Sequence, residues 1–199
     1  MADLNQLLMR IAGLCGITAP IISISLILLA IHNAPWFSWT GNALSDLGVE
    51  GSPAVLFNTS LIIGGLLTTV FAIGLIQALR IHILSRVGSM LFLLDAFALC
   101  AIGVFPETVG RLHFYVSVAF FTLFPLSLLL TGLAMVLETT KRRWGLLAII
   151  VAIIAVGTWI FRWPSPAIPE IIAALAASSW SIISGIRLYK SPQTARKII

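Results

Sequence analysis

Long apolar runs separated by short polar segments dominate the pattern of this chain. Each run approaches or reaches the ~20 residues that a helix needs to cross the ~30 Å hydrocarbon core of a bilayer. The pattern therefore predicts six membrane-spanning helices. Their approximate ranges are 11–32, 52–79, 86–104, 111–137, 144–161 and 168–188.

The apolar runs do not alternate with polar residues in the way that strands of a membrane barrel do. Residues 21–30 and 146–155 are almost continuously apolar and are too long for strands. Since only helices and closed barrels satisfy the backbone hydrogen bonds within lipid, we expect an all-α fold. The chain is predicted to be a polytopic six-helix bundle in which residues 1–199 form one integral membrane domain.

The longest connection between these spans is the first outer loop, at about residues 33–51. Asn42 is suited to cap a short helix there, and Gly48 is suited to end it. We therefore expect a short helix in this loop, lying against the bundle or re-entering it. Ser45 and Asp46 would lie near the end of that helix.

Prolines give further information on where spans begin and bend. Ser52 and Pro53 are expected to form the N-cap and first turn of the second span. In the sixth span, Pro169 fits the first helical position, and Glu170 is expected either to cap this helix or to join an outward-facing polar site. Pro20 would free the carbonyl of the residue four positions earlier and bend its span, which could open a cavity in the bundle.

Composition supports the membrane assignment and excludes a class of partner. The chain is 59% hydrophobic and 10% charged, whereas a soluble domain carries ~25% charged residues. The net charge of +5 comes from basic residues that flank the spans, so nucleic acid is not expected as a partner. Membrane lipids are the expected partners of these basic residues.

The basic residues also predict the topology. Ten of the 12 Lys and Arg residues fall on one side of the predicted spans, and only Arg111 and Arg162 fall on the other. By the positive-inside rule, this asymmetry predicts a multi-pass protein of the cell membrane with both termini in the cytoplasm.

One charged residue, Asp95, interrupts the third span about ten residues from its outer end. At 1.5 Å per residue this is ~15 Å deep, close to the bilayer centre. A carboxylate there costs ~2.5–3.5 kcal/mol on insertion scales, so we expect Asp95 to be protonated and to face a hydroxyl-lined pocket inside the bundle. It would serve either as a polar knot that joins helices or as a proton-linked or substrate-binding group. Its expected neighbours are Ser23 or Ser25, Thr122, and Ser178, Ser179 or Ser181.

Polar residues also gather where the third span ends and the fourth begins. Glu107 follows the third span, Arg111 opens the fourth, and His113 lies about one turn inside it. His113 is a candidate for an acid/base cluster with Asp46, Glu107 and Glu170, and Asp46, Glu107 and His113 are candidates for a metal site. Alternatively, His113 would bond a carboxylate of the same cap, and Arg111 would pair with Glu107 four residues away. The sequence indicates no cofactor.

Several of these residues form a recognisable pattern. The segments 44–48 and 103–107, together with Asn58 and His113, resemble the archaeal and bacterial membrane family called domain of unknown function 998 (DUF998). The resemblance covers most of the chain and implies a six-helix membrane bundle, but no established activity. Its recurring residues would be Ser45, Asn58, Pro106, Glu107 and His113, with Asp46 beside them.

Three functions follow as hypotheses from these observations. The first is a protein that binds or moves a lipid or another hydrophobic molecule through an outward-facing cavity with a polar mouth. The second is a membrane-embedded hydrolase or lipid-modifying enzyme, and the third is a structural subunit of a membrane complex. The sequence is compatible both with a homo-oligomer and with a partner membrane subunit. The candidate binding residues are Ser45, Asp46, Asn58, Glu107, Arg111 and His113.

Overall fold

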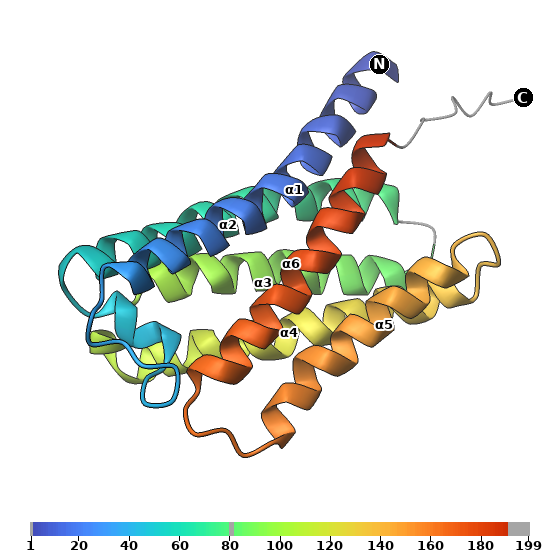
Figure 1. Ribbon diagram of the computed structural model, residues 1–199. Coiled ribbons are helices and arrows are strands. Elements are labelled where there is room, and N and C mark those ends of the chain that lie inside the picture. The colour runs from blue at the N-terminus through green and yellow to red at the C-terminus, as the bar shows by residue number, and fades with distance from the viewer. Residues whose placement is uncertain (1, 80–81, 191–199) are drawn as a thin grey trace, which may run out of the picture.

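Six long helices make up the computed structural model, which describes residues 2–79 and 82–190 (Figure 1). They are α1 (Ala2–His32), α2 (Gly51–Ala78), α3 (Ile83–Val104), α4 (Arg111–Val136), α5 (Arg142–Gly157) and α6 (Ala167–Lys190). Three short 3-10 helices lie in the connections: η1 (Leu44–Gly48), η2 (Glu107–Val109) and η3 (Thr158–Ile160). The described residues contain no strand, which confirms the all-α prediction.

Each long helix is apolar enough to cross a membrane, α5 together with the η3 turn that continues it. The protein is therefore a multi-pass membrane protein. The first span is longer than predicted, because α1 begins at Ala2 and not near residue 11. The apolar pattern predicted only the most apolar part of this helix, which its more polar first turns extend toward the N-terminus.

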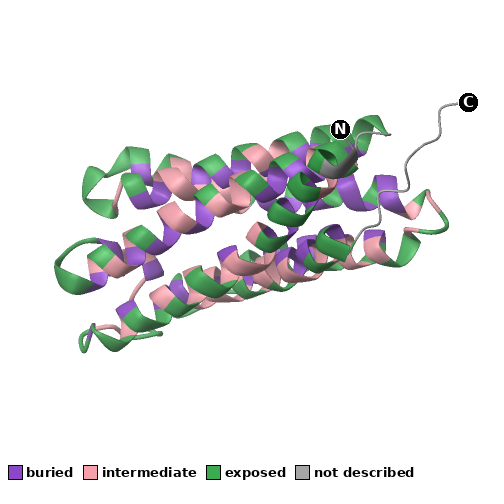
Figure 2. Ribbon diagram, turned by 90° about the horizontal axis from the view of Figure 1, so that it is seen from above, coloured by how far each residue is buried: buried purple, intermediate pink, exposed green. Residues whose placement is uncertain are grey.

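The helices form a ring in which chain neighbours pack together and α6 returns to α1. In Figure 1, α6 runs diagonally across α3 and α4, and both described ends of the chain lie at the same end of the bundle. Buried residues lie mainly on the sides of the helices that face the bundle interior, and exposed residues lie mainly on the outer sides (Figure 2). Many of the exposed side chains are large and apolar, as expected of a surface that contacts lipid.

Aromatic side chains fill the centre of the ring. Phe71, Phe92, Phe124 and Trp180 are all buried, and the rings of Phe92 and Trp180 are 5.3 Å apart in an edge-to-face arrangement. Phe71 packs edge-to-face on Phe92, with ring centroids 5.8 Å apart. We call these four residues the aromatic cluster. It closes the middle of the bundle.

Glycines allow the closest helix contacts. A Cβ atom on Gly145 of α5 would lie 2.6 Å from the carbonyl oxygen of Gly132 of α4. Similarly, a Cβ on Gly13 of α1 would lie 2.7 Å from the carbonyl oxygen of Gly185 of α6. Small residues of this kind let helices associate in lipid, where no hydrophobic force drives them together. Backbone contact thus fixes α4 on α5 and α1 on α6.

The expected short helix in the first outer loop is present, but it is a 3-10 helix and its cap differs from the prediction. The Oδ2 atom of Asp46 accepts hydrogen bonds from the backbone N–H of Ala43 at 3.0 Å and from the side-chain amide of Asn42 at 2.8 Å. Asp46 therefore caps η1 from within its own first turn. Asn42 supports this cap and does not itself cap the helix.

The expected helix starts are also displaced by one or two residues. α2 begins at Gly51, where the backbone has φ of +71°, so Ser52 is inside the helix and is not its N-cap. Pro53 and Pro169 are the third residues of their helices, not the first. The first four N–H groups of a helix have no partner within it, so proline is tolerated at all of these positions.

Candidate functional site

A cavity of about 140 Å³ lies inside the ring, between α1, α2, α3, α4 and α6. Ser45 of η1 and Glu170 of α6 line it near the outer loops. Phe92 and Phe124 of the aromatic cluster line it toward the bundle centre. Most of the remaining lining is apolar. We call this space the central cavity.

Asp95 of α3 lines the central cavity and is only 2% exposed. Its Oδ1 atom is buried and has no hydrogen-bond partner among the described residues. An unsatisfied buried polar group costs ~1–3 kcal/mol, so this oxygen is unfavourable for the fold as it stands. The prediction that Asp95 faces the bundle interior agrees with this position.

The hydroxyl groups expected around Asp95 lie partly where they were predicted. Ser23, Ser178 and Ser181 line the central cavity, whereas Thr122 lines a different space and Ser179 is exposed. The three that line the cavity donate to backbone carbonyls at 2.7–3.0 Å and not to Asp95. Three of the expected hydroxyl groups therefore line the cavity, but they bond to the backbone and leave the Oδ1 atom of Asp95 without a partner in the part of the chain that the structure describes.

Proline helps to shape this cavity. Pro20 lies within α1 and lines the cavity. The carbonyl four residues earlier, on Gly16, accepts a hydrogen bond from the hydroxyl of Ser181 at 2.8 Å. The backbone group freed by Pro20 is thus satisfied by α6, and this bond ties α6 to α1 beside the cavity.

A second, larger space of about 1160 Å³ runs between α4 and α5. We call it the lateral groove. Its walls include Phe114, Ile153 and Ile160, which are 62%, 62% and 78% exposed. Because these large apolar side chains lie at the bundle surface, the groove opens sideways toward the region that lipid tails occupy.

The groove and the central cavity meet at the end of the bundle that carries η1 and η2. Ser45, Ser117, Phe121 and Glu170 line both spaces. Ser117 is one helical turn after His113 on α4, so the two side chains share a face. A ligand head group held at this junction would contact residues of η1, α4 and α6 together.

Three carboxyl groups gather near this junction. The Oε2 atom of Glu170 accepts a hydrogen bond from the backbone N–H of Leu44, the first residue of η1, at 2.7 Å. Asp46 and Glu107 are close enough to Glu170 to interact with it electrostatically. Glu170 therefore does not cap its own helix, which was one of the two expectations. Its side chain instead holds η1 against α6.

Glu107 is the most exposed member of the group. Partial burial, together with the nearby Asp46 carboxyl, raises the pKa of Glu107, while Ser45 and His113 oppose the rise. Arg111 is exposed, and within the described part of the chain no ion pair joins it to Glu107. The expected Arg111–Glu107 pair is absent there, so the carboxyl group has no cationic partner on its own cap.

His113 has a defined hydrogen bond and little exposure. Its Nδ1 atom lies 2.7 Å from the carbonyl oxygen of Phe105, at the end of α3. A carbonyl oxygen can only accept, so Nδ1 carries the proton, and in the neutral ring Nε2 is left as an acceptor. His113 is 8% exposed and lines the lateral groove. The expected bond to a carboxylate is therefore replaced by one to the backbone.

Asn58 positions the first outer loop. Its side-chain amide donates a hydrogen bond to the carbonyl oxygen of Gly48 at 3.0 Å. A Cβ atom on Gly48 would lie 2.6 Å from the Oδ1 atom of Asn58, so a larger residue would displace this contact. Neither space is lined by Asn58, so its place is to hold η1 on α2.

The candidate residues do not assemble as a metal centre. Across residues 2–79 and 82–190, no three His, Cys, Asp or Glu side chains come together in an arrangement that could hold a metal ion. Asp46, Glu107 and His113 are near one another at the groove mouth, but the structure does not support their assignment as metal ligands. Their arrangement is better suited to binding protons and hydrogen-bond donors.

Comparison with known proteins places most of the chain in one group. A family model described as "Protein of unknown function (DUF998)" matches residues 17–187. No curated protein and no solved structure is similar enough to the chain to count as a match.

Proposed function

Because this chain belongs to the DUF998 family, whose description names no activity, we propose a function from its geometry: it binds an amphiphilic molecule in the lateral groove. The tail of the molecule would lie between α4 and α5, and its head group would reach the junction with the central cavity. The observation that carries the proposal is that one apolar groove ends at a cluster of polar side chains. These side chains belong to Ser45, Glu107, His113, Ser117 and Glu170.

The charges at the junction favour a basic head group. Asp46, Glu107 and Glu170 supply three carboxyls, and no ion pair within the described residues joins them to Lys or Arg. Asp95 adds a further unpaired carboxyl deeper in the central cavity. An ammonium group at the junction would relieve the repulsion between Asp46 and Glu107 and would form charge-assisted hydrogen bonds to their oxygens.

The aromatic cluster suggests how the molecule enters. Phe92 and Phe124 close the central cavity on the side away from the outer loops. A ligand would reach the junction from the outer loops or sideways from lipid. Passage toward the opposite end would require the rings of the aromatic cluster to separate, so we expect binding without transport in this conformation.

Native mass spectrometry of the detergent-purified protein tests this proposal. Hexadecylamine, hexadecanol and hexadecyl sulfate share one tail and differ in head-group charge. We expect the amine to be retained more than the alcohol, and the sulfate least. The Glu107→Gln variant should lose the preference for the amine. Glu50→Gln is a matched control, since Glu50 is exposed in the same loop region and does not line the groove.

Two results would contradict the proposal in different ways. Equal retention of all three molecules by wild type and Glu107→Gln would remove the role of the carboxyl groups. Failure to retain any of them, or retention that a Val156→Trp substitution in the groove wall does not reduce, would remove the groove as the binding site.

A specific observation also favours the hydrolase hypothesis as a second candidate. The Phe105 carbonyl fixes the His113 proton on Nδ1, so Nε2 is free to accept a proton from a hydroxyl group in the groove. Ser45 lines the same groove and is the candidate nucleophile. Labelling by a fluorophosphonate that Ser45→Ala and His113→Ala both abolish, and Ser117→Ala does not, would support it. No labelling of wild type would count against it.

We also infer that the basic end of the bundle faces the cytoplasm, which rests on the positive-inside rule alone. Lys141 lies at this end, in the connection between α4 and α5. An impermeant amine-reactive reagent should fail to label Lys141 in intact cells and should label it after lysis. Labelling in intact cells would reverse the orientation. The structural-subunit hypothesis stays a prediction.

A further inference from the structure

A separate pocket of about 160 Å³ lies at the basic end of the bundle, far along the helices from the lateral groove's mouth. It is bounded by the ends of α2, α4 and α6 and by the start of α5. Its polar lining comprises Lys141, Ser184 and Arg187, with the indole of Trp144 beside them. Among the described residues that line it there is no carboxylate, so the pocket is positively charged.

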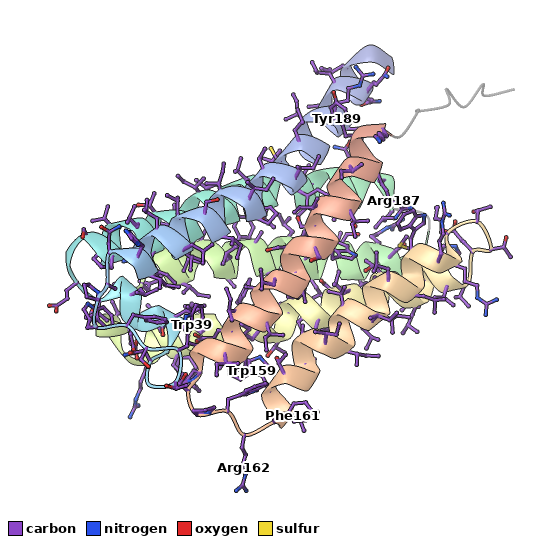
Figure 3. All side chains as sticks on the ribbon, viewed as in Figure 1. Trp39, Trp159, Phe161, Arg162, Arg187 and Tyr189 are labelled. Carbon is purple, nitrogen blue, oxygen red and sulfur yellow. The ribbon has the colours of Figure 1, made fainter. Side chains whose placement is uncertain are left out.

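The guanidinium group of Arg187 is the central feature of this pocket. Its carbon atom Cζ lies 4.0 Å from the centre of the Trp144 ring, and that of Arg143 lies 4.8 Å from the same ring. Figure 3 shows Arg187 where α6 ends, close to the start of α5. No ion pair in the described part of the chain joins Arg143 or Arg187 to a carboxylate, although Lys141 pairs with Glu138 at 2.8 Å.

Two unpaired guanidinium groups around one indole repel each other, and their contacts with the ring offset only part of this repulsion. The start of α5 increases the positive potential. Lys141, Arg142 and Arg143 occupy it, its first turn has no acidic residue, and no side chain caps it. Helix dipoles favour negative charge at this position, so the sequence here is opposite to what the isolated helix prefers. An anion would relieve both unfavourable arrangements.

We propose that this pocket binds a phosphate-bearing anion, either the headgroup of an anionic phospholipid in the adjoining leaflet or free phosphate. Arg187 would hold the phosphate through paired N–H donors, and the hydroxyl of Ser184 would add a third. Trp144 has the amphipathic ring that is common at the headgroup level. Basic pockets between membrane helices recognise phospholipid headgroups by this chemistry.

Thermal unfolding of the full-length protein in detergent tests the proposal. Phosphatidylglycerol and phosphatidylcholine with the same short chains are added separately, and inorganic phosphate is added in a third series. We expect phosphatidylglycerol to raise the unfolding midpoint more than phosphatidylcholine. Arg187→Gln should weaken the apparent affinity roughly ten-fold, because it removes the charge-assisted hydrogen bonds of the guanidinium group.

Lys190→Gln is the matched control, because it removes the same charge from the last turn of α6 without lining the pocket. If Arg187→Gln does not fold, Lys141→Gln removes another lining cation and leaves the stacking on Trp144 intact. Stabilisation by phosphatidylglycerol alone assigns the site to the headgroup, and stabilisation by inorganic phosphate that Arg187→Gln removes assigns it to free phosphate. Equal losses in the pocket variants and Lys190→Gln, or no preference for either anion in wild type, would overturn the proposal.

Discussion

Replacing Asp95 with leucine distinguishes a structural carboxyl group from one kept for function. Leucine has the same branched heavy-atom skeleton as aspartate, so its two methyl groups would take the places of the carboxyl oxygens beside the central cavity. Asp95 is 2% exposed and its Oδ1 atom has no partner among the described residues, so the substitution removes an unsatisfied polar group. That penalty is ~1–3 kcal/mol. We therefore expect Asp95→Leu to raise the free energy of unfolding by about this amount.

Denaturant titration in mixed micelles, followed by far-ultraviolet circular dichroism, measures this change. Thr131→Val is the matched control, because it also replaces a buried polar group by an apolar one of similar shape. The Thr131 hydroxyl donates to the carbonyl of Ser127 at 2.8 Å, so its loss should destabilise the protein by ~0.5–1.5 kcal/mol. The two substitutions are expected to have opposite signs.

A loss of ~1 kcal/mol or more in Asp95→Leu would refute this reasoning, since it would mean that the carboxyl group makes a stabilising contact. A gain in stability together with loss of hexadecylamine retention would support a functional role. Such a result fits the general finding that functional groups are often retained at the expense of stability.

Three further outcomes are expected. Stability should fall as the pH rises from about 4.5, the ordinary pKa of Glu107, through the raised pKa that Glu107 has in the folded protein. The reason is that the folded protein binds the proton of Glu107 more tightly than the unfolded chain does. Thermal midpoints across this pH range should therefore fall less in Glu107→Gln than in wild type. Glu170 accepts a hydrogen bond from the backbone N–H of Leu44 in η1, so Glu170→Ala should destabilise the protein by ~1.5–3 kcal/mol and speed amide exchange in η1. Glu50→Ala, at an exposed position, should do neither. Gly145→Ala should lower the midpoint through its clash with α4, while Gly157→Ala, which meets no atom within 4 Å, should leave it unchanged or raise it.

The sequence predicts the spans and the inward direction of Asp95 because both follow from the cost of placing polar groups in lipid. That cost depends only on residue type and depth, so a single chain is enough to evaluate it. The same reasoning predicted that Pro20 frees a backbone carbonyl, although it could not name Ser181 as the group that bonds it.

The contacts of the site depend on how the ring closes, and no local pattern encodes them. The position of Glu170 at a helix start suggested that its side chain caps that helix. Instead, the carboxyl group accepts a hydrogen bond from the backbone of Leu44, 126 residues earlier. The α5 wall of the lateral groove was also missed. Residues such as Ile153 and Val156 belong to a helix that is apolar on every side, and periodicity alone cannot say which side faces the groove. Ser117 was within reach of prediction, since it lies one turn after His113.

The contact between Gly132 and Gly145 fixes one end of the space between α4 and α5. From Leu129, just beyond this contact, the groove follows α4 to His113, which is about 24 Å at 1.5 Å per residue. One leaflet contributes only about 15 Å of hydrocarbon. A straight tail lying along the whole groove would therefore end past the bilayer midplane. The contact between the two glycines would then limit the length of tail that fits the groove, so that molecules would be selected by chain length independently of head-group charge.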